Sequence, residues 1–243
     1  MRATSFGGHL YFATFIDDFT RFCWVFGLKE KSDVFLAFRK FVLMAENACE
    51  RKLVTLRTDR GGEYMSHEFS AFMHSHGIVH QCTTPYTPQQ NGVAERRNRT
   101  LMEMARCMLK SKDLSSRFWL EAAMCANYVR NRCPIKALKS MIAYEAWNGR
   151  VPVVTHMRIF GSLAYVHVPA HQRHKLEAKA LKCIFVGYSS ESKGYQLYVP
   201  STQKIIESQD VIFDEYASQP LLTCKQQPTI GLTDVFVAFV WFK

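Results

Sequence analysis

The feature that most constrains the fold is an alternating segment, residues 53–58 (LVTLRT), which leads directly into an acidic residue. Apolar and polar side chains alternate along this segment, which is typical of a half-buried β-strand. Asp59 follows, and Gly61 and Gly62 then indicate a turn. The sequence therefore predicts a carboxylate at the tip of a strand.

A second carboxylate is expected at the start of a long helix. The loop of residues 84–92 (TPYTPQQNG) precedes a helical pattern that runs from Val93 to Lys110, with Glu95 in its first turn, and thirty-five residues lie between Asp59 and Glu95. Carboxylates at a strand end and in a first helical turn can converge on one point. Oxygen ligands suit hard cations such as Mg²⁺ or Mn²⁺, which organise phosphoryl transfer.

The segments around the two acids resemble a known family. Asp59 lies in the motif TDRGGEY, and Glu95 lies in TPYTPQQNGVAERRNRTLMEMAR. Both motifs resemble the integrase catalytic core of Ty1/copia-type retrotransposon Pol polyproteins, where the second Asp and the Glu of a three-carboxylate set occur in this context.

The resemblance implies a function and a set of ligands. An intact member of the family processes DNA 3′ ends and joins them to target DNA. Asp59 and Glu95 are then the expected catalytic residues and metal ligands, with Mg²⁺ or Mn²⁺ as cofactor. The expected partners are element ends, target DNA and further copies of the chain, and the expected location is the nucleus.

Basic residues are concentrated just after Glu95. The chain has a formal net charge of +10, and eleven Lys or Arg stand against three acidic residues between Arg96 and Lys139, a local surplus of eight. Such a surface favours binding to a polyanion, although two well-solvated helices would have a similar composition. The residues expected to contact DNA are Gln90, Asn91, Arg96, Arg97, Arg99, Arg106 and Lys110.

The first 150 residues have the pattern of an α/β domain. Residues 10–16 and 21–28 are predicted to form a β-hairpin because a short turn-rich loop joins them. Strands alternating with helices predict a mixed sheet with flanking helices. The resemblance implies a three-layer, ribonuclease-H-like integrase core. The other predicted strands are 53–58 and 78–82, and the predicted helices are 34–45, 66–76, 93–110 and 114–132.

The pattern changes to short strands after Pro152. The motif KCIFVGYSSESKGYQLYVP, followed by SQDVIFDE, resembles the SH3-like barrel that follows the integrase core in copia-type polyproteins. Basic residues there make a second DNA contact plausible, and they are Arg173, Lys175, Lys179 and Lys182. The five predicted strands are 163–168, 183–188, 195–199, 204–208 and 211–213.

We therefore predict three parts: a core at residues 1–150, a small all-β barrel at 155–216, and an unrelated tail at 217–243. The resemblance is expected to end near residue 215. Residues 235–242 are eight apolar residues in a row, too few for a membrane helix. They predict either an added strand or an exposed, aggregation-prone end.

The first carboxylate of the family's set is expected to be absent, since the match begins just after the strand that carries it. Asp17 and Asp18 are the only acidic residues before Glu30. Their position in a hairpin turn favours a turn-forming role, and substitution for the lost group is the alternative.

The main rival function is a non-catalytic DNA-binding remnant or host-adopted module. A ribonuclease H is disfavoured because the loop before Glu95 resembles that of integrases. The eight cysteines are scattered without a Cys-x-x-Cys pair, which favours reduced thiols in an intracellular protein.

Overall fold

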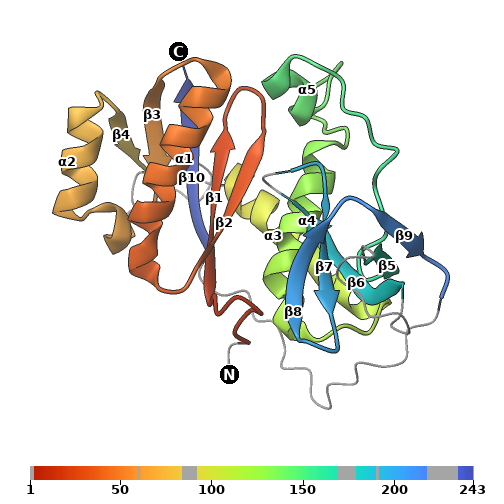
Figure 1. Cartoon of the computed structure of the whole chain (residues 1–243). Helices are drawn as coiled ribbons and strands as arrows, with labels where there is room; N and C mark the ends of the chain where they lie inside the picture. Colours follow the sequence, from red (N-terminus) through yellow and green to blue (C-terminus); the bar gives the residue numbers. More distant parts are fainter. Residues whose placement is uncertain are drawn as a thin grey trace.

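The structure is a computed structural model, and it describes residues 3–59, 61–83, 92–168, 179–189, 192–217 and 235–242. The described strands form two five-stranded sheets, with helices packed around the first of them (Figure 1). None of the helices in these ranges combines the length and the apolar character needed to cross a bilayer. The prediction of a mixed α/β core followed by an all-antiparallel, SH3-like sheet is confirmed.

The first sheet has the strand order β2-β1-β10-β3-β4. β1 and β2 form the predicted antiparallel hairpin, and β3 pairs with β4 in parallel. β3 has the bounds that the alternating pattern predicted. The strands are β1 (Tyr11–Asp17), β2 (Cys23–Leu28), β3 (Leu53–Thr58), β4 (Val79–Cys82) and β10 (Val235–Phe242).

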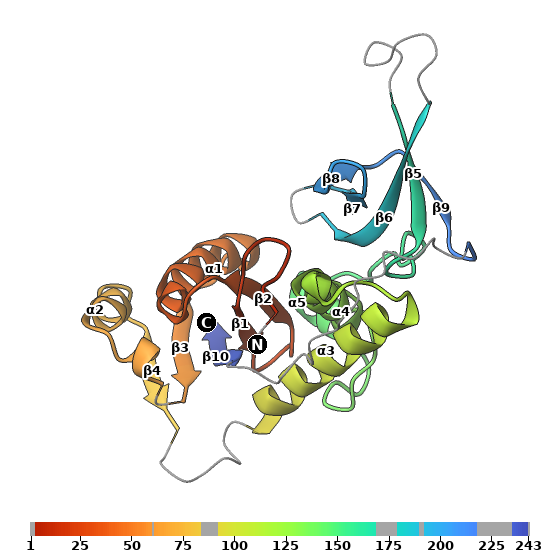
Figure 2. The ribbon, with the colours of Figure 1, turned by 90° about the horizontal axis from the view of Figure 1, so that it is seen from below.

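The last strand occupies the centre of this sheet. β10 runs parallel to β1 and antiparallel to β3. It therefore lies between β1 and β3, which do not pair with each other. Figure 2 shows β10 between β1 and β3, inside the layer of strands. Of the two alternatives for the apolar run, the added strand is therefore the one that forms.

Two helices cover one face of the first sheet. α1 (Val34–Cys49) places Val34, Phe38, Phe41 and Val42 in the core, as its apolar spacing predicted, and α2 (His67–Ser75) adds Phe69 and Met73. Ser66 caps α2 by accepting a hydrogen bond from the N–H of Phe69 at 3.2 Å. Gly77 ends this helical segment with a φ of +67°.

Two more helices cover the opposite face. α3 (Gly92–Ser111) packs Ala94 and Leu101 against the sheet, and α4 (Trp119–Asn131) packs beside α3 and against β2. α4 starts later than predicted because residues 116–118 form a 3-10 turn, whose cap is Ser115. A short helix that the sequence analysis did not predict, α5 (Ala143–Asn148), follows.

The second sheet is antiparallel throughout, with the order β8-β7-β6-β5-β9. β6 begins before the predicted residue 183, and the other four strands agree with the predictions to within one residue. The strands are β5 (Leu163–His167), β6 (Ala180–Tyr188), β7 (Tyr195–Val199), β8 (Lys204–Ser208) and β9 (Val211–Asp214).

One apolar cluster joins the two sheets through α4. Phe12 of β1 and Leu109 of α3 belong to the same cluster as Ile184, Val186 and Tyr198 of the second sheet. The α4 side chains between them include Trp119, Leu120, Ala122 and Ala123. The second sheet is thus packed onto the core, and residues of both predicted domains share one hydrophobic interior.

Candidate nucleic-acid and metal site

Asp59 is exposed at the end of β3. Its Oδ1 accepts a hydrogen bond from the backbone N–H of Gly61 at 3.0 Å, so the predicted turn holds this carboxylate. The preceding residue, Thr58, is buried, and its hydroxyl Oγ1 lies 2.8 Å from Nε2 of His80 on β4, within hydrogen-bond distance. The strand end is therefore fixed on one side, while Asp59 is open to solvent.

The alternation of β3 indicates the face on which Asp59 lies. Leu56 points into the core beneath α1, and the guanidinium of Arg57 points to the other face, where it lies 4.5 Å from the centre of the Trp241 ring. Continued by two residues, the alternation places Asp59 on the same face as Arg57. This is the face that α3 covers.

Glu95 is exposed in the first turn of α3. One turn later, the buried side chain of Asn98 accepts a hydrogen bond from Thr14 of β1 at 3.0 Å. Thr14 of β1 pairs with Val237 of β10, and the next residue of β10, Ala238, pairs with Thr58 of β3. Because β10 and β3 are antiparallel, continuing the register by one residue places Val237, and with it Thr14, opposite Asp59. The start of α3 is thereby attached at the end of the sheet where Asp59 lies.

Within the described residues no ion pair joins Glu95 to Arg99, although the two residues are four apart on the helix. The same part of the structure contains no group of three or more His, Cys, Asp or Glu side chains that could hold a metal ion. Asp59 and Glu95 are therefore two exposed carboxylates that do not belong to a three-residue metal cluster among these residues.

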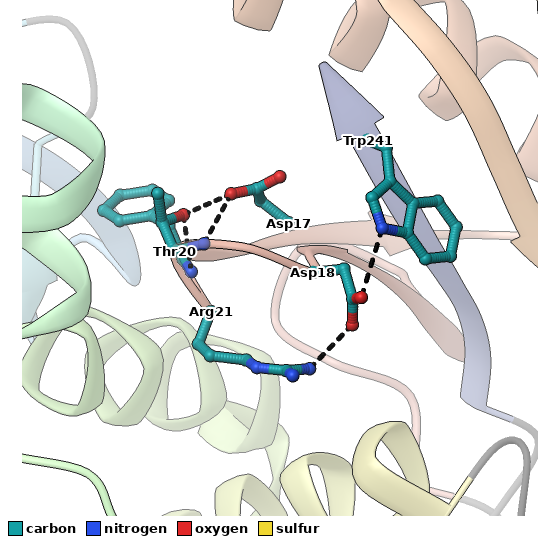
Figure 3. A network of polar contacts seen from close by, with 6 residues as sticks. Asp17, Asp18, Thr20, Arg21 and Trp241 are labelled. Atoms are coloured by element: carbon teal, nitrogen blue, oxygen red, sulfur yellow. Dashed lines mark hydrogen bonds and ion pairs between the residues drawn. The ribbon is translucent and has the colours of Figure 1, made fainter. Parts of the chain in front are cut away.

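Asp17 and Asp18 are engaged in the turn between β1 and β2 (Figure 3). Asp17 is buried and accepts hydrogen bonds from the backbone N–H and the hydroxyl of Thr20, at 2.8 and 2.5 Å. Asp18 forms an ion pair with Arg21 at 2.8 Å and accepts a hydrogen bond from the indole N–H of Trp241 at 3.1 Å. Both acids therefore have structural partners, in agreement with a turn-forming role.

The register also separates these acids from Asp59. Asp17 is level with Val240, and Val240 is level with Leu56, three residues before Asp59. Two inter-strand spacings and three residues of strand rise put the Cα atoms of Asp17 and Asp59 about 14 Å apart. Oxygen atoms that bind one Mg²⁺ lie about 2 Å from it. Asp17 and Asp59 therefore do not share an ion in this arrangement.

The exposed surface of α3 is basic. Arg96, Arg99 and Lys110 are exposed and Arg106 is half-buried, and these four residues recur at the spacing of one helical face, where Glu95 and Glu103 are the exposed acids. We call Arg96, Arg99, Arg106 and Lys110 the basic face of α3. It begins beside Glu95 and runs along the helix away from it.

Arg97 has a different position from its neighbours. Its guanidinium donates hydrogen bonds to Oδ1 of Asn127 at 3.2 Å and of Asn131 at 2.6 Å, both on α4. The amide groups of these asparagines donate in turn to the carbonyl oxygen of Cys23 on β2, each at 2.8 Å. Arg97 thus joins α3, α4 and the sheet, and sequence reasoning that grouped it with the DNA-binding residues missed this role.

The remaining candidates divide into three groups. Gln90, Asn91, Arg173 and Lys175 lie outside the described residues. Lys179 and Lys182 are exposed at the start of β6. Trp119 is buried, and the ring of Tyr128 stacks on Tyr188 with 4.0 Å between centroids, so both aromatic side chains of α4 serve packing.

Comparisons with known proteins agree with this architecture. The family model for the integrase core domain matches residues 1–88, and that for the retroviral polymerase SH3-like domain matches residues 162–227. The retrovirus-related Pol polyprotein from transposon TNT 1-94 of Nicotiana tabacum is 44% identical over 237 residues, which are 98% of this chain and 18% of that protein. Over most of its length the chain is similar to the integrase-core region of copia-type Pol polyproteins.

Two further copia-type relatives match at lower identity. The Pol polyprotein from transposon RE2 of Arabidopsis thaliana is 34% identical over 87% of this chain and 14% of that protein. The Ty1-LR3 Gag-Pol polyprotein of Saccharomyces cerevisiae is 27% identical over 83% of this chain and 12% of that protein. The chain thus spans less than a fifth of the length of these relatives. The tobacco match also extends well past residue 215, so the expectation that the resemblance ends there is wrong.

Two solved structures are similar at low identity. The simian T-cell lymphotropic virus intasome in complex with PP2A regulatory subunit B56 gamma gives a TM-score of 0.46 at 18% identity, covering 81% of this chain and 69% of that chain. The HTLV-2 integrase catalytic core domain in complex with magnesium gives a TM-score of 0.44 at 19% identity, covering 54% of this chain and 80% of that chain.

Proposed function

We propose that this chain binds DNA along the basic face of α3 and serves, within a copia-type Pol polyprotein, in the integration of element DNA. One observation carries the proposal. The exposed positive side chains of α3 begin at the same end of the helix as Glu95, and this end is attached at the level of Asp59. A polyanion lying on α3 would therefore pass the two carboxylates.

The electrostatics of α3 favour phosphate contacts without base specificity. Side chains of Arg and Lys that neutralise phosphates release counterions, so binding weakens steeply as salt rises. Four such contacts correspond to a slope of about −3.6 in a plot of log K against log salt concentration. Lys179 and Lys182, exposed on the second sheet, are proposed as a further contact with the same duplex.

Asp59 and Glu95 are the residues that would hold a divalent metal. Their exposed carboxylate oxygens are the donor type that Mg²⁺ and Mn²⁺ prefer, so the donor set fits such an ion. A bound divalent ion would polarise a phosphate oxygen and stabilise developing charge. With two protein ligands, most of its coordination shell would be water, and we therefore expect weak binding.

A second candidate function is DNA binding without chemistry. The structure favours it through one observation: β10, the strand between β1 and β3, has no acidic residue, and Asp17 and Asp18 are held in the turn. In that case the basic face of α3 would bind DNA, but the metal site would lack a third protein ligand.

Salt titration of DNA affinity tests the shared part of both candidates. The Arg96→Ala, Arg99→Ala double variant should lower the steepness of the log–log slope by about 1.8, because two phosphate contacts are lost. The matched control is Arg39→Ala, Lys40→Ala, which removes two exposed charges from α1 on the opposite face of the sheet. An unchanged slope in the α3 variant, or an equal change in the control, would contradict the assignment of this face.

A further inference from the structure

The interval between β1 and β3 is a complete binding site for one β-strand. β10 pairs with β1 from Phe12–Val235 to Asp17–Val240, and with β3 from Thr58–Ala238 to Leu53–Phe242. Both backbone edges of β10 are therefore used. The backbone also continues the contact past the strand, since the N–H of Asp18 donates to the carbonyl of Val240 at 3.1 Å.

The side chains of β10 fill both faces of the sheet. Ala238 and Val240 are fully buried in the cluster beneath α1 and α2. Phe239 is buried on the opposite face, among Ile16 of β1 and side chains of α3, and Trp241 packs there as well. Residues 238–242 of β10 thus pack against apolar side chains on both faces of the sheet.

Without β10 the first sheet would divide into two pairs of strands, β2–β1 and β3–β4. β1 and β3 would each expose a row of unpaired N–H and C=O groups beside apolar side chains, and such edges readily pair with another strand. No other described strand lies between them. The first sheet is therefore continuous only when one apolar strand lies between β1 and β3, parallel to β1 and antiparallel to β3.

We infer that the interval between β1 and β3 is a strand-acceptor site, which β10 fills from within the chain and which the same segment of a second copy can fill in trans. An identical strand from a second copy makes the same backbone and side-chain contacts. Twenty residues, 215–234, separate β9 of the second sheet from β10 in the sequence. This inference concerns the sheet alone and does not depend on DNA binding.

Hydrogen exchange and peptide binding on the full-length chain test the inference. Ala238 is level with both Phe15 and Thr58, so Ala238→Pro removes a ladder donor at the centre of the site. We expect amides of β1 and β3 to exchange at least tenfold faster in this variant. A fluorescent peptide of residues 234–243, with added terminal lysines for solubility, should bind the variant at least tenfold more tightly than the unmodified chain and restore the slow exchange.

Two controls accompany this experiment. Ile212→Pro places a proline in β9, an exposed edge strand of the other sheet, and should leave exchange in β1 and β3 and peptide binding unchanged. The same peptide with proline in place of Ala238 should not bind. Slow exchange in β1 and β3 of Ala238→Pro without added peptide would overturn the inference.

A refolding experiment on the unmodified chain decides the matter where Ala238→Pro fails to fold. The chain is refolded from urea with a tenfold excess of the labelled peptide. We expect label to elute with folded protein, and the proline-containing peptide not to do so. Equal incorporation of both peptides, or incorporation of neither, would overturn the strand-acceptor site and leave the salt dependence of DNA binding as a separate question.

Discussion

The indole N–H of Trp241 donates a hydrogen bond to the carboxylate of Asp18, across 3.1 Å and 223 residues of sequence. Because Arg57 lies over the same ring, Trp241 joins the turn after β1 to β3, the strand that Asp59 follows. Trp241→Phe keeps an apolar ring and removes the donor. We expect the free energy of unfolding, measured by urea denaturation, to fall by about 2 kcal/mol.

Asp18→Asn is the matched control for that variant, since it keeps an oxygen acceptor for the indole while it weakens the ion pair with Arg21. It should cost less than Trp241→Phe. A Trp241→Phe protein as stable as the unmodified chain would show that this contact does not hold β10 in place.

Arg97 and Arg96 should separate stability from DNA binding. Arg97→Met leaves the side-chain oxygens of Asn127 and Asn131 without their charged donor, so we expect a loss of about 2–3 kcal/mol in the free energy of unfolding. The salt slope of DNA binding should stay constant. Arg96→Met should do the reverse, with unchanged stability and a shallower slope. A shallower slope for Arg97→Met alone would mean that Arg97 leaves α4 to contact DNA.

Burial should make stability depend on pH through Glu121. Desolvation raises the pKa of its carboxyl from 4.5 to about 7, and its Oε2 lacks a hydrogen-bond partner within the described structure. Between these two values the folded chain keeps a proton that the unfolded chain has lost. The free energy of unfolding should therefore fall as pH rises from about 4.5 to about 7, by at most about 3 kcal/mol, and stay low above pH 7.

Urea denaturation of Glu121→Gln over this range checks the Glu121 prediction. The variant should be more stable than the unmodified chain at pH 8 and similar to it at pH 4. Glu103→Gln, which changes an exposed acid on α3, should show neither effect. Parallel pH profiles for Glu121→Gln and the unmodified chain would contradict the assignment.

Metal binding should be weak and should depend on Asp59. Mg²⁺ needs several oxygen ligands in near-octahedral geometry, and two carboxylates supply only part of them. Calorimetry should give a millimolar dissociation constant or no measurable heat, and Asp59→Asn should abolish any signal. Glu68→Gln, which changes an exposed acid in the first turn of α2, is the control and should change nothing. Tight binding that survives Asp59→Asn would place the metal elsewhere.

A strand-transfer assay with Mn²⁺ should distinguish the two candidate functions. If the described acids are insufficient for chemistry, the chain as given should not join DNA ends, and neither should Glu95→Gln. The rival role for Asp17 and Asp18 predicts joining by the unmodified chain and its loss in the Asp17→Asn, Asp18→Asn double variant. Since Asp17 bonds Thr20 inside the turn, we expect that double variant to lose stability instead, which circular dichroism on heating would detect.

Local patterns predicted most elements of this fold. Residues 53–58 alternate, and they form β3 with the same bounds, because a half-buried strand imposes that period on its side chains. The spacing of Phe38, Phe41 and Val42 likewise predicted the core face of α1. α4 begins five residues later than predicted, because Ser115 caps a 3-10 turn before the helix proper begins.

Local sequence patterns could not predict the position of β10 within the sheet. Eight apolar residues in a row satisfy an edge strand, a central strand or an exposed end equally well, and only pairing with β1 and β3 selects the centre. The same limit applies to Arg97, whose neighbours in sequence face solvent while its own side chain faces α4. Asp59 and Glu95 stood out because sequence motifs surround them, and their roles in metal binding and catalysis stay predictions.

The apolar cluster around α4 has a geometrical consequence for a long ligand. Leu109 on α3 and Ile184 on β6 pack into one interior, so the positive side chains of α3 and the lysines at the start of β6 are carried by a single packed body. The distance along a duplex between two such contacts would then be fixed by side-chain packing and not by the length of a flexible linker. Such a protein can demand a fixed footprint from DNA whose sequence it does not read.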